Sequence, residues 1–333
     1  MKRALVAVAA FLSIWSAAQA QHLTGAGATF PYPIYSKWFS EYSAAHRGVE
    51  VNYQSIGSGG GIRQVEAGLI DFGASDMPMT DAMLKASPIK LIHLPSVLGA
   101  VVPIFNVSGV TGLRIGRGTL AEIYLGKIVN WNDPRIAADN PGTRLPDEKI
   151  TIVHRADTSG TTFIFTYYLS KVSQQWSAQV GRGPSVAWPV GVGGKGNEGV
   201  AGLVRELPGA IGYVELTFAL QNHMTFAAIR NAAGNWVKGS IQSVTDAAAS
   251  VTNTSADFRI SITDAPGADA YPISSFTYLL IPAEPGNAAK RKVLKDLLSW
   301  ILKSGESQAA ALSYSPLPES LVRKELQVVY SLK

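Results

Sequence analysis

The fold expected for this chain follows from one stretch, Arg155-Ala-Asp-Thr-Ser-Gly-Thr161, which joins a strand-like run at 150–154 to a helix-like run that starts at Thr162. The first backbone N–H groups of a helix have no partner within the helix, and the helix dipole places partial positive charge there. This turn therefore brings free N–H donors, hydroxyl groups and a guanidinium into one small volume. Such a set of donors suits a dehydrated oxyanion.

Two earlier turns have the same character. The first contains Thr29 and Phe30 and precedes a helix near Pro31, and the second is a glycine-rich run around Ser58, followed by helical spacing from Ile62. Glycine allows the backbone to approach a ligand closely. Ordinary N-capping of a helix by Ser or Thr is the alternative explanation for any one turn. Three such turns in one chain favour a binding site, to which the third contributes Ser159, Gly160 and Thr161.

Two charged side chains stand at the third turn. The guanidinium of Arg155 presents a planar set of donors that suits phosphate or carboxylate. Asp157 follows two residues later, and we expect its carboxylate to hold that guanidinium in place by a salt bridge. The alternative is an exposed ion pair of little energetic consequence.

Asp76 follows a short apolar run at 70–75 that is a candidate for a buried strand. A carboxylate beside an anion site is unfavourable unless the anion carries a proton. Phosphate keeps at least one proton at neutral pH and sulfate keeps none, so a carboxylate that accepts this proton distinguishes the two ions. The alternative is a cap for the helix around Met83, although Thr80 and Asp81 suit that role better.

Strand-like and helix-like segments alternate along the chain, which predicts an α/β fold. Two long apolar runs, 98–105 and 273–281, stand at either end of a segment that is long enough for a second domain. We therefore expect a discontinuous first α/β domain (21–100 and 273–333) that encloses a second one (101–272). Two crossings between domains form a hinge, and a ligand then lies in the cleft.

The composition and the N-terminus restrict the class of protein. With 47% apolar and 16% charged residues, the chain is expected to fold. Residues 1–20 have the basic start, apolar run and small-residue end of a signal peptide, with cleavage expected after Ala20. The absence of cysteine and the length of the exported chain fit a bacterial periplasm. The net charge of +5 is too small to indicate nucleic-acid binding, and we expect a monomer.

No catalytic, metal or cofactor site is predicted. The run 191–196, with Glu215 about twenty residues further on, matches the dinucleotide pattern. This pattern more often marks a glycine-rich turn between a strand and a helix. Exported proteins also rarely meet free NAD, so we do not predict a dinucleotide cofactor. The five histidines lack the spacing of a metal site, and His154 is expected to pack or to face solvent.

Beyond these single residues, seven phrases occur in one order, at 23–31, 52–61, 71–76, 123–127, 155–161, 193–197 and 207–213. In them the chain resembles the periplasmic phosphate-binding proteins of high-affinity phosphate ABC importers. The resemblance implies two α/β lobes joined by a hinge that close on phosphate. It also implies a set of phosphate-binding residues, with Asp157 holding the guanidinium: Thr29, Phe30, Ser58, Asp76, Arg155, Ser159, Gly160 and Thr161.

The resemblance further implies a function. The protein would bind inorganic phosphate with high selectivity and deliver it to a membrane-embedded ABC permease, without catalysing a reaction. Three alternatives remain open from the residues themselves. One is a receptor for another oxyanion, such as sulfate, molybdate or a phosphate ester. Another is a periplasmic phosphatase that uses Ser159 or Thr161 as a nucleophile. The third is an adhesive or extracellular phosphate scavenger on the same fold, since surface partners leave no motif in this sequence.

Overall fold

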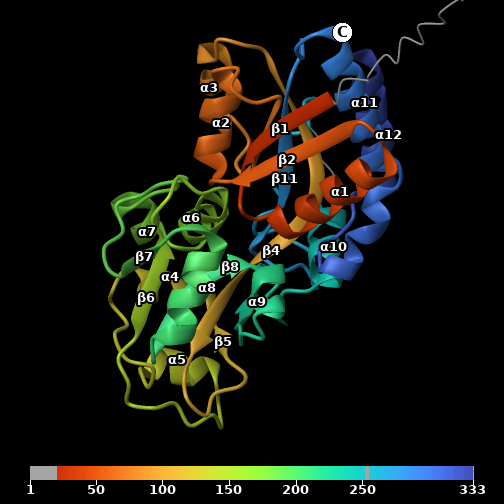
Figure 1. Ribbon diagram of the computed structural model, residues 1–333. Helices are drawn as coiled ribbons and strands as arrows, with labels where there is room; N and C mark the ends of the chain where they lie inside the picture. Colours follow the sequence, from red (N-terminus) through yellow and green to blue (C-terminus); the bar gives the residue numbers. More distant parts are fainter. Residues whose placement is uncertain (1–20, 252–254, 333) are drawn as a thin grey trace, which may run out of the picture.

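The computed structural model describes residues 21–251 and 255–332, so the predicted signal peptide lies outside the described residues. The chain forms two α/β lobes, seen one above the other in Figure 1. A single mixed sheet of eight strands runs through both, in the order β2-β1-β3-β11-β4-β8-β6-β7. The predicted α/β class is confirmed.

The first lobe contains one end of this sheet. Its strands β2, β1 and β3 are parallel to one another, and β11 pairs with β3 in the antiparallel sense. The bounds are β1 (Gln21–Gly27), β2 (Val49–Ser55), β3 (Phe72–Ser75) and β11 (Ser274–Pro282). The helices of this lobe are α1 (Tyr32–Ala45), α2 (Ser58–Glu66), α3 (Asp81–Ala86), α11 (Ala288–Lys303) and α12 (Glu319–Ser331), with short 3₁₀ turns at Gly305–Gln308 and Ala310–Leu312.

The second lobe contains the other end of the sheet and a small three-stranded sheet. Strands β6 and β7 are parallel to each other and β8 is parallel to β6. The strands are β6 (Thr151–Arg155), β7 (Val192–Gly194) and β8 (Ala210–Glu215), with β5 (Arg114–Ile115), β9 (Ala228–Arg230) and β10 (Trp236–Val237) in the small sheet. The helices are α4 (Arg117–Tyr124), α5 (Pro134–Asp139), α6 (Gly160–Val172), α7 (Gln174–Gln179), α8 (Gly196–Glu206) and α9 (Leu216–Gln221).

One long strand, β4 (Leu91–Asn106), connects the lobes. Its first part pairs with β11 and its last part, from Val101, pairs with β8. The strand begins at Leu91, earlier than the apolar run at 98 predicted, because Pro95 and Ser96 interrupt the apolar pattern without ending the pairing with β11. Helix α10 (Ile241–Ala249) packs against both β4 and β11 at this junction.

Local sequence signals explain several elements. Helix α1 starts directly after Pro31. Its aromatic residues recur at helical spacing and are buried, namely Tyr35, Trp38, Phe39 and Tyr42. In α11 the apolar residues are buried in the same way, while Lys292 faces solvent and pairs with Asp296. In both helices the apolar residues that recur at helical spacing form the face that enters the core.

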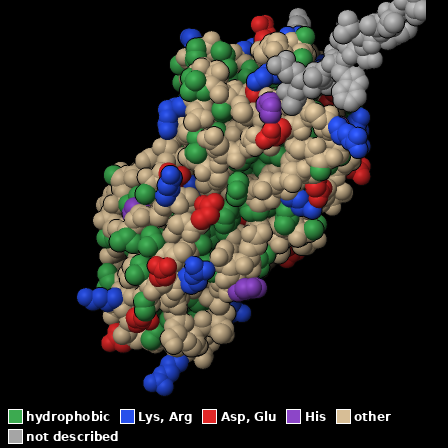
Figure 2. Space-filling view, in the orientation of Figure 1, with side chains coloured by type: hydrophobic (Ala, Val, Ile, Leu, Met, Phe, Trp, Pro, Cys, Tyr) green, Lys and Arg blue, Asp and Glu red, His purple; other side chains and the backbone are tan. Residues whose placement is uncertain are grey.

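The charged side chains are interspersed rather than gathered by sign on the face shown in Figure 2. This distribution agrees with the small net charge of the chain. Within residues 21–251 and 255–332, no helix has the length and apolar character needed to cross a membrane.

Candidate functional site

The three predicted turns meet at the junction of the two lobes. Parallel strands of one sheet carry the loops at their carboxyl ends to the same edge, which is where α/β proteins bind ligands. The turns after β1 and β2 come from the first lobe, and the turn between β6 and α6 comes from the second. Figure 1 shows the start of α6 next to α2 across this junction. The hydroxyl oxygen of Ser58, at the start of α2, accepts the backbone N–H of Gly160, at the start of α6, at 3.1 Å.

The guanidinium of Arg155 is held by Asp157 in a two-pronged pair. Nε donates to Oδ1 at 2.8 Å and Nη2 donates to Oδ2 at 2.5 Å. Burial by itself raises the pKa of the Asp157 carboxyl, but the bonds and charge of Arg155 outweigh it, so this pKa lies below its ordinary value. The Arg155 side chain is 1% exposed, which rules out the exposed ion pair considered as the alternative.

Four hydroxyl groups at the junction accept hydrogen bonds but donate none within the described chain. Ser58 Oγ accepts from the N–H groups of Asp76 and Gly160, and Ser159 Oγ accepts from Thr162 as the N-cap of α6. Thr161 Oγ1 accepts from Arg155 Nη1 at 3.3 Å, and Thr29 Oγ1 also accepts only. All four residues are at most 4% exposed. Four buried O–H protons are thus left to a ligand.

Two backbone donors add to this set. In the part of the chain that the structure describes, the N–H groups of Thr29 and Phe30 have no acceptor, although both residues are buried. The N–H of Gly160 is engaged by Ser58 across the junction. The first turn therefore offers free backbone donors, as the sequence predicted. The N–H of Gly160, by contrast, already forms a hydrogen bond between the two lobes.

Asp76 supplies the acceptor of the site. Its Oδ1 accepts the hydroxyl proton of Thr277 at 2.7 Å, and its Oδ2 is buried without a partner among the described residues. Burial raises the pKa of Asp76 to about 7, although the bond from Thr277 and the charge of Arg155 oppose this. The capping alternative is wrong, because Thr80 caps α3 by accepting the N–H of Met83.

Gly160 is required by close packing across the junction. A Cβ at this position would lie 2.4 Å from Ser58 Oγ and 2.5 Å from Asp76 Oδ2. These distances are far inside van der Waals contact, so a larger residue would separate α6 from the first lobe. Glycine is therefore needed here because of the space available for a side chain, and not because of the backbone conformation.

Sequence reasoning missed two members of the site, Asn197 and Thr277. Asn197 lies in the first turn of α8, in the glycine-rich run that matched the dinucleotide pattern, and it is fully buried. This run is a strand-to-helix turn like the other three, and that likeness was the available signal. Glu215 of the same pattern is fully buried as well and caps α9 by accepting the N–H of Thr217.

The remaining candidates lie elsewhere. His154 is half-buried and stacks on Trp188, with ring centroids 4.9 Å apart, so of the two predicted positions, packed or facing solvent, the structure shows the packed one. Burial lowers the pKa of its ring. Among the residues described, no group of three His, Cys, Asp or Glu side chains lies close enough to hold a metal ion.

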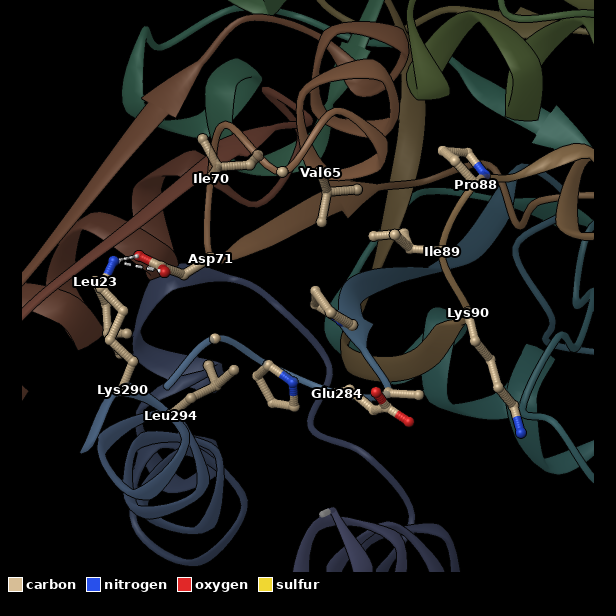
Figure 3. Close-up of a pocket in the computed structure, with 15 residues that line it drawn as sticks. Leu23, Val65, Ile70, Asp71, Pro88, Ile89, Lys90, Glu284, Lys290 and Leu294 are labelled. Carbon is tan, nitrogen blue, oxygen red and sulfur yellow. Dashed lines mark hydrogen bonds and ion pairs between the residues drawn. The ribbon is translucent and has the colours of Figure 1, made fainter. Parts of the chain in front are cut away.

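A separate pocket of about 550 Å³ lies in the first lobe, near the start of β3 rather than its end. Figure 3 shows Lys290 joined to Asp71 there, while Lys90 points away from this pair. Because the ammonium of Lys290 is already paired at 2.8 Å, this pocket lacks the converging donors found at the junction.

The family model for the PBP superfamily domain matches residues 15–305 of this sequence. The phosphate-binding protein PstS of Xylella fastidiosa strain Temecula1 is 49% identical over 91% of this chain and 83% of its own length. The chain belongs to this family of phosphate-binding proteins.

A second relative and a solved structure are also similar to this chain. The PstS of Pasteurella multocida is 44% identical over 97% of this chain and 94% of its own length. A solved structure of a high-affinity periplasmic phosphate-binding protein, PfluDING, bound with phosphate, superposes with a TM-score of 0.74. It covers 92% of this chain and 93% of its own at 20% identity, so it shows the fold alone. The two-lobed fold implied by the resemblance is confirmed.

Proposed function

We infer that this chain binds inorganic phosphate at the lobe junction and presents it to an ABC permease. One observation carries the site assignment: at this junction, buried donors that have no acceptor among the described residues occur together with one buried carboxylate oxygen that has no donor among them. A tetrahedral oxyanion that still carries a proton satisfies both sets at once. The proposed phosphate-binding residues are Thr29, Phe30, Ser58, Asp76, Arg155, Ser159, Gly160 and Thr161.

The charge balance of the site explains how it would select phosphate. Arg155 is compensated by Asp157, so the anion is held mainly by neutral dipoles. The ionised carboxylate of Asp76 accepts the P–OH proton at Oδ2. Sulfate has no such proton at neutral pH and would leave that oxygen buried and unpaired beside an anion, which is costly.

Phosphate would bridge the two lobes and stabilise the closed form, because both lobes contribute donors. The permease would then distinguish the closed form from the open one. We propose a periplasmic monomer that neither binds nucleic acid nor catalyses a reaction, with the signal peptide removed after Ala20. The domain boundaries at 100 and 273 belong to the same proposal, since β4 changes its partner from β11 to β8 after Ala100, and β11 begins opposite Ala100.

Calorimetry tests this function directly. The protein is unfolded to remove bound ligand, refolded, and titrated with phosphate or sulfate at pH 8, where the Asp76 carboxyl is mostly ionised. We expect heat and one site with phosphate, and binding of sulfate weaker by about four orders of magnitude. Comparable affinity for sulfate would refute the role of Asp76, and no heat with phosphate would refute the function itself.

A further inference from the structure

The amide of Asn197 connects the two lobes at the site. Its Nδ2 donates to Thr29 Oγ1 of the first lobe at 2.7 Å and to Thr161 Oγ1 of the second lobe at 3.3 Å. Its Oδ1 accepts the backbone N–H of Glu215 at 2.9 Å. Asn197 is fully buried, so these bonds form away from water.

The contact with Glu215 determines which way this amide faces. A backbone N–H can only donate, so the atom that meets it must be the oxygen of the amide. The nitrogen is therefore the atom that faces both threonines. An amide nitrogen only donates, so the hydroxyl oxygens of Thr29 and Thr161 must both accept from it.

This has a consequence for the protons of the two hydroxyl groups. Thr161 Oγ1 accepts from Arg155 as well as from Asn197, so both of its lone pairs are used. Thr29 Oγ1 accepts from the side chain of Asn197 and also lies 3.4 Å from its backbone nitrogen. Neither hydroxyl can then turn its proton back towards the protein. Both protons remain directed to the ligand.

We propose that Asn197 is a positioning residue that orients the hydroxyl groups of Thr29 and Thr161 as donors and latches the lobes in the closed form. The inference rests on the proposed function and adds to it. Opening of the lobes breaks the bond to Thr29 and keeps the bonds to Thr161 and Glu215, which lie in the same lobe as Asn197. The latch therefore slows the release of phosphate and leaves its capture unchanged.

The test measures phosphate association and dissociation rates by stopped flow. We expect Asn197→Ala to raise the dissociation rate about tenfold to hundredfold, as the loss of a buried hydrogen bond implies, and to leave the association rate within about twofold. Asn197→Asp keeps the acceptor for the N–H of Glu215 but has no donor, so it folds and releases phosphate at least as fast as the alanine variant.

Two comparisons separate a latch from a merely structural role. Asn231→Ala removes an equally buried amide that bonds the carbonyl groups of Gly267, Ala268 and Ala270, away from the site. We expect it to lower the melting temperature without changing the dissociation rate. In a chain that already carries Thr29→Val, Asn197→Ala should raise the dissociation rate much less than it does in the natural chain. The reason is that Thr29→Val has already removed the hydrogen bond between the two residues.

The outcomes that contradict the proposal are distinct. Two results would overturn the latch and leave phosphate binding intact. One is a wild-type dissociation rate in both Asn197 variants. The other is a double variant in which the effects of Asn197→Ala and Thr29→Val on the dissociation rate simply multiply. A stripped natural chain that gives no heat with phosphate would overturn the proposed function and the latch with it.

Discussion

At the scale of single residues, Asp76 decides which ion the site accepts. One oxygen of its carboxyl accepts a hydrogen bond from Thr277, and the other is fully buried without a partner in the part of the chain that the structure describes. Burial raises its pKa to about 7, so in the empty site the carboxyl loses its proton around neutral pH. Selectivity for a protonated anion is therefore expected to grow as the pH rises through 7.

Replacing Asp76 by Asn tests this role. The amide can donate from the position of Oδ2, so it tolerates an anion without a proton. We expect the preference for phosphate over sulfate to fall by at least about a hundredfold, as a lost pairing of a buried charged group implies. Competition calorimetry at pH 8 measures it. A variant that discriminates as well as the natural chain would contradict the assignment.

Replacing Arg155 by Lys tests the guanidinium. Lysine cannot make the two-pronged pair with Asp157 and also donate to Thr161 and the ligand, so phosphate affinity should fall about tenfold to hundredfold. The matched control is Arg135→Lys, because Arg135 makes the same two-pronged pair with Asp133, at 2.9 Å and 2.8 Å, on the surface. Titration calorimetry should find wild-type affinity in the control. Equal affinity in both variants would show that Arg155 does not bind the anion.

At the scale of elements, the site consists of turns that end parallel strands and begin helices. Each turn places hydroxyl or N–H donors at a helix start: Thr29 before α1, Ser58 in α2, Ser159 before α6 and Asn197 in α8. The approach of α6 to the first lobe is closest at Gly160. How closely two elements pack should therefore control phosphate affinity.

Gly160→Ala tests that approach. Gly160 lies in a helix with ordinary φ, so alanine is compatible with its backbone. Its Cβ would meet Ser58 and Asp76, and overpacking costs roughly 1–3 kcal/mol, which predicts about a tenfold to hundredfold loss of phosphate affinity. Gly202→Ala in α8 is the control, since a Cβ there meets nothing within 4 Å. Titration calorimetry measures the phosphate affinity of the two variants. An unchanged affinity in Gly160→Ala would mean that the junction does not close this tightly on phosphate.

At the scale of the whole molecule, the buried carboxyl of Asp76 couples stability to pH. In the folded empty protein this group keeps its proton up to a pKa of about 7, whereas the unfolded chain releases it near 3.8. The folded state therefore binds more protons between these values, and its stability relative to the unfolded state falls as the pH rises from about 4 to about 7.

The comparison of the natural chain with Asp76→Asn isolates this contribution. Without phosphate, we expect the variant to gain stability relative to the natural chain between pH 4 and pH 8, by up to about 4 kcal/mol for a shift of about three pKa units. Thermal unfolding followed by circular dichroism at several pH values measures the difference. A constant difference across this range would show that the Asp76 carboxyl titrates normally.

The sequence alone determined the local parts of this protein. The strand, turn and helix around 155–161, the helix start at Pro31, the amphipathic faces of α1 and α11 and the pair of Arg155 with Asp157 depend on residues a few positions apart. Such contacts follow from backbone geometry and capping chemistry, which act within one or two turns of the chain.

Only the tertiary structure decided which distant residues meet at the site. Thr277 reaches Asp76 over 201 positions and Asn197 reaches Thr29 over 168, and no local pattern specifies such pairs. They arise because β11 pairs with β3 and because β4 passes from the first lobe to the second, so that the ends of distant strands lie at one edge. The order of strands in the sheet fixes these neighbours, and that order depends on the packing of the whole chain.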